Sequence, residues 1–384
     1  MIGFSISRRG VVALGTLALL AGCKVIPSGA PDSTPPVDQP SATTLPADQL
    51  RHRVALLVPL SGANAGVGQS IANATTMALL DTNAANLRIT TYDTATGVPA
   101  AAARAVADGN KLILGPLLGE DVPAVAATAR GARIPVITYS NDATVAARDV
   151  FIMGSVPGQS IGRTLAHARS QRLTRFGALV PASEYGRRAG DAFVAALRAQ
   201  GGSLVGLETY DRGNASATAA ARRLRDKGPM DGVLIADTGR VSAQVAALLK
   251  PSTAASPKIL GTEQWSGDTA VAASPSLRGA LFSAVADMRF RQFAESYKTR
   301  FGAQPYRIAT LGYDSVLLTL RVARDWKPGI AFPTARLVDR GGFLGLDGAF
   351  RFDASGLIER SLEVREVRAG GTSVVSPAPA RFAD

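Results

Sequence analysis

Apolar residues along this chain alternate between short continuous runs and longer segments in which they recur every three or four positions. The run at 54–58 is wholly apolar, as in a parallel strand buried on both faces, and residues 67–80 have a helical period. Further strands are expected at 87–93, 111–114, 134–139, 151–153, 176–180, 203–209, 232–236, 258–261 and 280–285. Further helices are expected at 100–108, 122–130, 159–168, from about 187, and at 291–301 and 308–326. This alternation predicts an α/β fold with parallel sheets.

The strand-helix alternation starts twice, once after residue 51 and again near residue 151. Of the 384 residues, 46% are apolar, which is enough for two medium-sized cores. Two α/β lobes in sequence imply a ligand cleft between them, because loops that follow parallel strands face the crevice. Residues 345–367 alternate in the manner of hairpin strands around Asp353-Ala354-Ser355-Gly356.

The first fifty residues have a different pattern. A pair of arginines precedes an apolar stretch at 11–20, which is too short to span a bilayer, since about 20 residues are needed. The stretch ends in Leu20-Ala21-Gly22-Cys23, which resembles the lipobox of bacterial lipoproteins. We therefore expect a signal peptide at 1–22 and a lipidated Cys23 that opens a proline-rich tether at 23–51.

Cys23 is the only cysteine, so the chain can form neither an internal disulfide nor a C-x-x-C metal site. A buried cysteine after a hydrophobic helix is the alternative interpretation. Lys24 stands where lipoproteins kept in the inner membrane often have Asp, which favours the outer membrane. The protein is therefore expected to face the periplasm and to be held at a membrane through lipid on Cys23.

The formal charge of +12 is scattered along the chain. Its densest run, at 222–227, is not interleaved with aromatic residues as a single-strand nucleic-acid groove requires, so we expect no nucleic-acid partner. A solvated basic surface is the simpler interpretation, and attraction to anionic lipid or cell-wall polymer is the alternative. With only His52 and His167, no histidine-rich metal site is expected, nor any cofactor.

Each segment that resembles an enzyme motif lacks residues that the motif requires. Residues 66–71 form an incomplete dinucleotide fingerprint that lacks the last glycine, and Gln69-Ser70-Ile71 lacks the glycines of a hydrolase elbow. The spacing of Asp347 and Asp353 does not build a calcium loop, and a hairpin turn explains both better. No catalytic constellation is present, so the protein is not expected to be an enzyme.

Several motifs, in order, resemble the leucine/isoleucine/valine-binding branch of the type I periplasmic binding proteins. The match extends over about residues 52–370. Its elements are Ser61-Gly62, Leu114-Gly115-Pro116-Leu117, Pro135-Val136-Ile137, Glu184-Tyr185-Gly186-Arg187, Phe293-x-x-x-Tyr297, Phe301-Gly302, Pro305 and Tyr313-Asp314. The resemblance implies a two-lobed α/β fold in which each lobe is a parallel sheet with helices on both faces. It assigns 52–157 and 286–338 to the first lobe, 158–285 and 339–370 to the second, and 371–384 to a flexible tail.

In amino-acid-binding members of this family, lobe-one loops hold the ligand carboxylate and a second-lobe carboxylate holds its ammonium group. Glu263 matches that carboxylate, and a solvated loop glutamate is the alternative. The candidate cleft residues are Ser61, Gly62, Leu117, Tyr139, Ser140, Asn141, Tyr185, Asp237 and Glu263. A packed ring is the alternative for Tyr139, a partly buried ring at a helix start for Tyr185, and helix capping for the two serines.

The loop after Gly115-Pro116 departs from the family pattern. Amino-acid-binding members have small hydroxyl residues there, whereas this chain has Leu118, Gly119, Glu120 and Asp121. Each carboxylate would repel a ligand carboxylate by ~1 kcal/mol at ~4 Å in water. The loop therefore counts against binding of an α-amino acid.

Two functions remain open. The closest resemblance is to penicillin-binding protein activator (LpoA-like) lipoproteins, which implies stimulation of a peptidoglycan synthase by protein–protein contact. The alternative is the substrate-binding lipoprotein of an ABC importer, which closes on an amino acid or a related small polar ligand and delivers it to the permease. A cell-wall hydrolase is the least supported, because no catalytic constellation is present.

Overall fold

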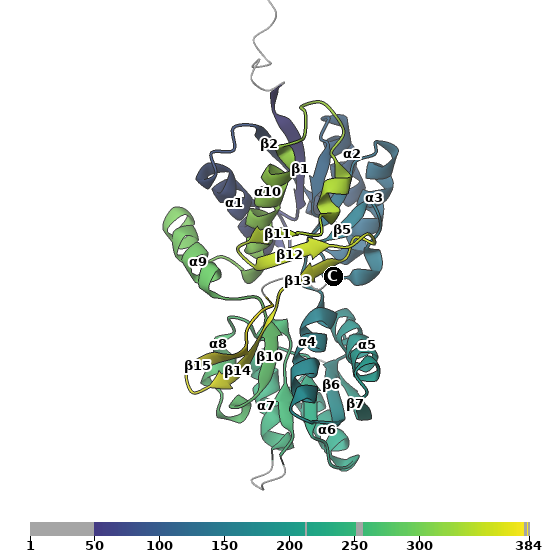
Figure 1. Ribbon diagram of the computed structural model, residues 1–384, viewed down its shortest axis with the longest axis vertical. Helices are drawn as coiled ribbons and strands as arrows, with labels where there is room; N and C mark the ends of the chain where they lie inside the picture. The colour runs from purple at the N-terminus through teal and green to yellow at the C-terminus, as the bar shows by residue number, and fades with distance from the viewer. Residues whose placement is uncertain (1–49, 212, 251–255, 380–381, 383–384) are drawn as a thin grey trace, which may run out of the picture. The chain divides into compact units, whose positions relative to one another are not determined.

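The computed structural model describes residues 50–211, 213–250, 256–379 and 382 (Figure 1). All of these described residues belong to one compact unit. The expected signal peptide, the lipidated Cys23 and nearly all of the tether lie outside the described residues. Among the described helices, none combines the length and the apolar character that crossing a membrane requires.

The first lobe is built on a parallel five-stranded sheet with the order β2-β1-β3-β4-β5. Its strands are β1 (His52–Val58), β2 (Leu87–Asp93), β3 (Leu112–Leu114), β4 (Val136–Thr138) and β5 (Val150–Ile152). Its helices are α1 (Ala65–Asp81), α2 (Val98–Ala107), α3 (Val122–Gly131), α9 (Met288–Phe301) and α10 (Thr310–Ala323). Because residues 54–58 of β1 are all apolar, this strand lies at an inner position of the sheet and is covered on both faces.

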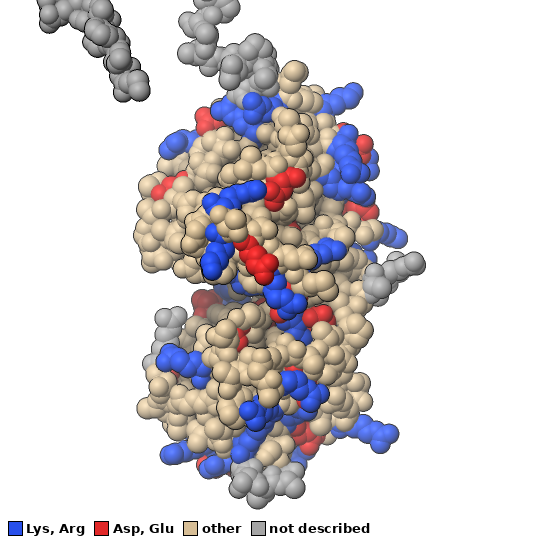
Figure 2. Space-filling view, turned by 90° about the vertical axis from the view of Figure 1, so that its left-hand side faces the viewer, with Lys and Arg blue, Asp and Glu red and all other residues tan. Residues whose placement is uncertain are grey.

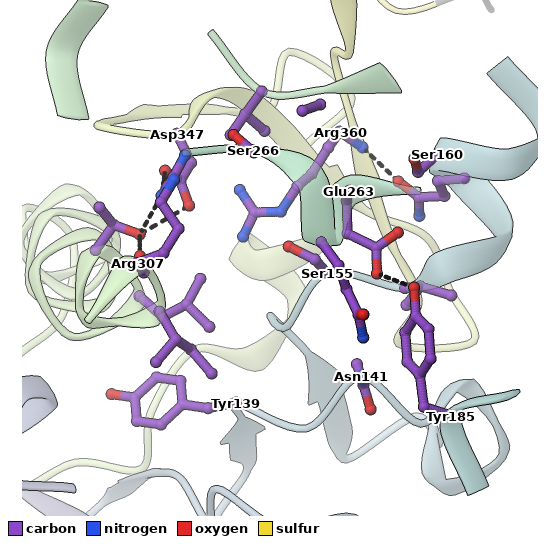
Figure 3. Close-up of a pocket in the computed structure, with 18 of the residues that line it drawn as sticks. Tyr139, Asn141, Ser155, Ser160, Tyr185, Glu263, Ser266, Arg307, Asp347 and Arg360 are labelled. Atoms are coloured by element: carbon purple, nitrogen blue, oxygen red, sulfur yellow. Dashed lines mark hydrogen bonds and ion pairs between the residues drawn. The ribbon is translucent and has the colours of Figure 1, made fainter. Parts of the chain in front are cut away.

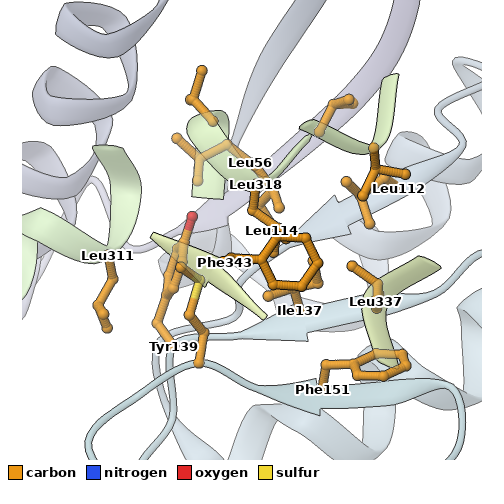
Figure 4. Packing of buried hydrophobic residues seen from close by; sticks show 14 of the residues in the cluster. Leu56, Leu112, Leu114, Ile137, Tyr139, Phe151, Leu311, Leu318, Leu337 and Phe343 are labelled. Atoms are coloured by element: carbon orange, nitrogen blue, oxygen red, sulfur yellow. The ribbon is translucent and has the colours of Figure 1, made fainter. Parts of the chain in front are cut away.

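A small antiparallel sheet closes one side of the first lobe. It comprises β11 (Phe343–Gly345), β12 (Gly348–Phe352) and β13 (Ile358–Arg360), with turns at Leu346-Asp347 and at 353–357. Alternate residues of these strands, among them Phe343 and Phe350, join the core around Leu114 and Phe151 (Figure 4). The assignment of all of 339–370 to the second lobe is therefore wrong, because the apolar faces of β11–β13 are buried in the first.

The second lobe is built on a seven-stranded sheet with the order β15-β14-β10-β9-β8-β6-β7. Its strands are β6 (Arg175–Pro181), β7 (Ser203–Tyr210), β8 (Gly232–Ile235), β9 (Lys258–Leu260), β10 (Leu281–Ala284), β14 (Glu363–Arg368) and β15 (Gly371–Ser376). Strands β14 and β15 pair antiparallel at one edge, which corrects the prediction that 371–384 is only a flexible tail. The chain turns back at Gly370 (φ 74°), and β15 then pairs with β14.

The helices of the second lobe are α4 (Pro157–Ser170), α5 (Glu184–Ala199), α6 (Asn214–Asp226), α7 (Gly239–Leu249) and the short α8 (Thr269–Ala273). Helix α5 begins where Ser183 Oγ accepts a hydrogen bond from the Gly186 N–H, and the chain leaves it through Gly201 at φ 68°. The fold class is thus confirmed, with α6 and α7 as elements that the hydrophobic pattern had not predicted.

Candidate functional site

A cavity of ≈ 410 Å³ lies between the two lobes, at the ends where their parallel strands terminate. On the face shown in Figure 2, the molecule is hollowed at this level and charged side chains gather there. Residues after β3 and β4 and at the start of α10 form the first-lobe wall, and residues of α4, α5 and the segment after β9 form the second-lobe wall. The lining residues that can form hydrogen bonds include Asn141, Ser155, Gln159, Tyr185, Glu263, Arg307, Asp347 and Arg360 (Figure 3).

Glu263 follows β9 and enters the cavity from the second lobe. The Tyr185 hydroxyl, at the start of α5, donates to its Oε1 at 2.9 Å, whereas its Oε2 is buried and has no partner. Burial raises the pKa of Glu263 to about 7, although the bond from Tyr185 acts in the opposite direction. Burial and the nearby Glu263 also raise the pKa of Tyr185 well above its ordinary value. The pair therefore presents one unused acceptor to a ligand.

Arg307 and Asp347 form an ion pair on the first-lobe side. Arg307 Nη1 donates to Asp347 Oδ1 at 2.8 Å, and the Thr310 hydroxyl donates to Asp347 Oδ2 at 2.9 Å. Burial acts to raise the pKa of Asp347, but the charges of Arg307 and Arg360 outweigh it and hold that pKa below its ordinary value. Asp347 is thus a carboxylate, and it uses both of its oxygens.

Arg360, the last residue of β13, extends its guanidinium group toward the cavity between Asp347 and Glu263 (Figure 3). Its Nη2 donates to the Met153 carbonyl at 2.6 Å, and its guanidinium carbon lies 5.3 Å from the centre of the Phe350 ring. Its Nε and Nη1 are buried without a partner, as are Nε and Nη2 of Arg307. Two arginines therefore have hydrogen bonds left to donate beside the cavity.

Asp314 lies beneath this group and is fully buried in α10. Its two oxygens accept the backbone N–H groups of Leu346 at 2.6 Å and Asp347 at 3.2 Å, so it fixes the turn that carries Asp347. Burial and the charge of Asp347 raise the pKa of Asp314 to about 7. The two N–H donors and the charge of Arg360 act in the opposite direction, because they favour the ionised carboxylate.

A second set of contacts connects the lobes at the edge of the cavity. Arg188 of α5 contacts Asn141 Oδ1 at 3.0 Å and Asp142 Oδ2 at 3.0 Å, both in the loop after β4. The two charged side chains are mostly buried, 20% and 13% exposed, so their attraction is only partly screened by water. Arg188 therefore bridges the two walls of the cleft in this structure.

The structure brings five of the nine predicted cleft residues to the cavity: Leu117, Tyr139, Asn141, Tyr185 and Glu263. Tyr139 is also fully buried, with its hydroxyl 2.9 Å from Ser315 Oγ, so the packed-ring interpretation holds beside the cleft one. Burial raises the pKa of Tyr139, which therefore stays neutral.

The other four predicted cleft residues do not line the cavity. Ser61, beside Gly62, is exposed and donates to Asp93 Oδ2 at 3.0 Å, because its loop is fixed to the end of the neighbouring strand β2. Ser140 Oγ instead accepts the Asp142 N–H and holds the loop. Asp237 accepts the Tyr210 hydroxyl at 2.6 Å within the second lobe. Neither serine caps a helix.

The acidic loop after β3 also lies elsewhere than predicted. Leu117 and Leu118 line the cavity, but Glu120 and Asp121 do not, because they fall in the turn that leads into α3. The pKa of Asp121 is raised, mainly by burial and to a smaller extent by the neighbouring charge of Glu120. The prediction that these two carboxylates repel a ligand carboxylate is therefore wrong.

The lining residues that sequence reasoning missed include Ser155, Gln159, Arg307, Asp347 and Arg360. Asp347 was predicted to be an ordinary hairpin-turn residue, and it does lie between β11 and β12, but it is 3% exposed. The alternation of residues along β13 could have indicated that Arg360 is buried. It faces the same side as Ile358 and pairs with Phe350, so it places a charge at an inward position of an alternating strand.

Among the described residues, no group of three histidine, cysteine, aspartate or glutamate side chains is placed to hold a metal ion. His52 stacks on Trp326 with ring centres 4.0 Å apart, and burial lowers its pKa. The basic run of α6 is largely solvated, although Arg223 and Lys227 both contact Glu208 at 2.8 and 2.9 Å.

Comparison with known proteins assigns the fold. A family model described as "Periplasmic binding protein" matches residues 52–371. Among solved structures, a protein from Rhodospirillum rubrum assigned to a branched-chain amino acid ABC transporter superposes with a TM-score of 0.74 at 21% identity, over 85% of this chain and 100% of that one. A solute-binding protein from Rhodopseudomonas palustris BisB5, in complex with 3,4-dihydroxybenzoic acid, has a TM-score of 0.66 at 20% identity, over 85% and 96% of the two chains.

The LivJ substrate-binding protein from Streptococcus pneumoniae, in complex with isoleucine, has a TM-score of 0.61 at 18% identity, over 85% of this chain and 100% of that one. A curated relative, an uncharacterized protein of Rickettsia prowazekii (strain Madrid E), is 27% identical over 179 residues, which is 46% of this chain and 48% of that relative. The chain therefore matches about half the length of that relative.

Proposed function

This chain belongs to the periplasmic binding protein family, and we propose that it binds a small polar solute between its two lobes and presents it to an ABC permease. The cavity carries this proposal. It is walled by both lobes and holds buried charged groups of both signs with unused hydrogen-bonding capacity. Because an unpaired buried polar group costs about 1–3 kcal/mol, such groups favour a state in which a ligand pairs with them.

The relatives whose complexes are known support a ligand of this size. One holds isoleucine and another 3,4-dihydroxybenzoic acid, and both molecules carry a carboxyl group on a small body. The leader sequence supports a periplasm-facing protein anchored by lipid on Cys23. An anchored binding protein of this type would stay close to the membrane that holds its permease.

The activator of a peptidoglycan synthase loses one of its supports. The acidic loop was one of the features that favoured it, beside the lipobox, Lys24 and the proline-rich tether, and the carboxylates of that loop lie outside the cavity. No feature of the cavity favours a protein partner over a small ligand.

The proposal is tested by thermal unfolding of the purified protein with a library of amino acids, dicarboxylates, aromatic acids and sugars, followed by calorimetric titration of each compound that raises the melting temperature. A ligand at 100 times its dissociation constant is expected to stabilise the protein by ~2.7 kcal/mol. Ser155→Trp places an indole in the cavity and is expected to remove the shift. Ser61→Trp, on an exposed residue outside it, is the matched control. A library without any stabilising compound would contradict the proposal.

A further inference from the structure

Arg360 has no ion-pair partner within salt-bridge distance among the described residues. It is 7% exposed, whereas Arg307 shares its charge with Asp347. The two oxygens of Asp314 accept backbone N–H groups and form no hydrogen bond with the guanidinium group of Arg360. Arg360 is therefore a buried guanidinium group beside the cavity without a directly bonded carboxylate.

The unused donors of this cluster point to the missing partner. Nε and Nη1 of Arg360 and Nε and Nη2 of Arg307 are buried without acceptors. On Arg307, Nε and Nη2 form one edge of the guanidinium plane, the edge that binds both oxygens of a carboxylate. Nη1 donates to Asp347, so this edge has no acceptor among the described residues.

We propose that Arg360 and Arg307 bind the carboxylate group of the ligand, so that this protein selects small organic acids. The inference rests on the proposed function and adds the class of ligand. The bound carboxylate pairs with the buried guanidinium group of Arg360 and accepts from the donors that are otherwise unpaired. The opposite end of the ligand meets Glu263 Oε2, which accepts from an ammonium or hydroxyl group.

The location of this site differs from the one that the sequence had predicted. Leu117 and Leu118, which line the cavity after β3, have no side-chain donor for an anion. The anion-binding groups come instead from the turn that precedes α10 and from the end of β13. A carboxylate at this position would lie against the connection between β13 in the first lobe and β14 in the second.

The test compares carboxylates with their neutral carboxamides by calorimetric titration. The probes are isoleucine against isoleucinamide, 3,4-dihydroxybenzoate against its amide, benzoate against benzamide, and glutarate against glutaramide. We expect the carboxylate of each pair that binds to bind about 10- to 100-fold more tightly, as for hydrogen bonds to a charged group. Arg360→Met is expected to bring that ratio close to one, and Arg360→Lys to retain part of it.

Arg351→Met is the matched control, because Arg351 lies on the adjacent strand β12, pairs with Glu359 and does not line the cavity. It is expected to leave the ratio unchanged. Carboxamides or sugars that bind wild-type protein as tightly as carboxylates would overturn the inference and leave the proposed function standing. An unchanged ratio in Arg360→Met would also overturn it, whereas no binding by any compound overturns both. If Arg360→Met does not fold, the inference is still tested by the carboxylate-to-carboxamide affinity ratios of the wild-type protein and of Arg360→Lys.

Discussion

Replacing Glu263 with glutamine tests whether this carboxyl group is held protonated by its surroundings. In the folded protein its pKa is about 7, against an ordinary value of 4.5. Because the folded state binds the proton more tightly, its contribution to stability is complete below about pH 4.5 and is lost as the pH rises through about 7. A rise of about 2.5 in pKa, at 1.36 kcal/mol for each unit, corresponds to a loss of ~3 kcal/mol.

The glutamine side chain in Glu263→Gln would keep an oxygen for the Tyr185 hydroxyl and would not ionise. Urea unfolding of the ligand-free protein, measured from pH 4 to pH 8.5, gives the free energy of unfolding of wild type and variant. The stability of Glu263→Gln relative to wild type is expected to increase by ~3 kcal/mol across this range. Glu295→Gln, at an exposed position of α9, is the matched control and should show a constant difference. Parallel profiles for wild type and Glu263→Gln would refute the reasoning.

Three further substitutions test other parts of the molecule. Arg188→Ala removes the contacts with Asn141 and Asp142 that connect the lobes. In stopped-flow and titration measurements the ligand should therefore dissociate faster and bind about 10-fold more weakly, as expected for loss of a charge-assisted hydrogen bond. Unchanged dissociation rates would contradict the bridging role of Arg188. Tyr139→Phe removes the buried hydrogen bond to Ser315 without leaving a void and should lower the free energy of unfolding by ~1 kcal/mol, and an equally stable variant would speak against that bond. Cys23→Ser should release the protein from the membrane fraction and prevent lipid labelling, and a variant that still sediments with membranes would contradict the anchoring prediction.

The order of the strands and helices was predictable because short continuous apolar runs such as that in β1 are typical of strands covered on both faces. Helices α6 and α7 were not predicted, and for α6 the reason is a weak hydrophobic pattern. The buried stripe of α6 consists of Ala217, Ala220, Ala221 and Leu224, and small side chains give a weak hydrophobic period. The place of β11–β13 was not predictable, because a short hairpin has apolar residues on one side whichever lobe it covers.

Part of the site was predictable by the same reasoning. Glu263 and Tyr185 follow strands of the second lobe at their carboxyl ends, where the fold places a ligand, and both line the cavity. Ser61 also follows a strand, yet Asp93 on the next strand holds its hydroxyl away from the cleft. Local position in the sequence therefore identifies residues near the crevice, but the hydrogen bonds that aim each side chain depend on partners more than 30 positions away.

If Arg360 binds the ligand carboxylate as proposed, it connects the choice of ligand to closure of the lobes. The chain passes between the lobes three times, and each passage contributes to the cavity wall: Ser155 and Val156, Ala284 and Val285, and Arg360 with Leu362. Arg360 also donates to Met153, which precedes the first passage, so its guanidinium group joins two of the three connections. A carboxylate that neutralises Arg360 would stabilise the closed arrangement at these connections, whereas a neutral ligand would leave the buried charge unpaired there. Discrimination by charge would then act on closure of the lobes as well as on contact with the ligand.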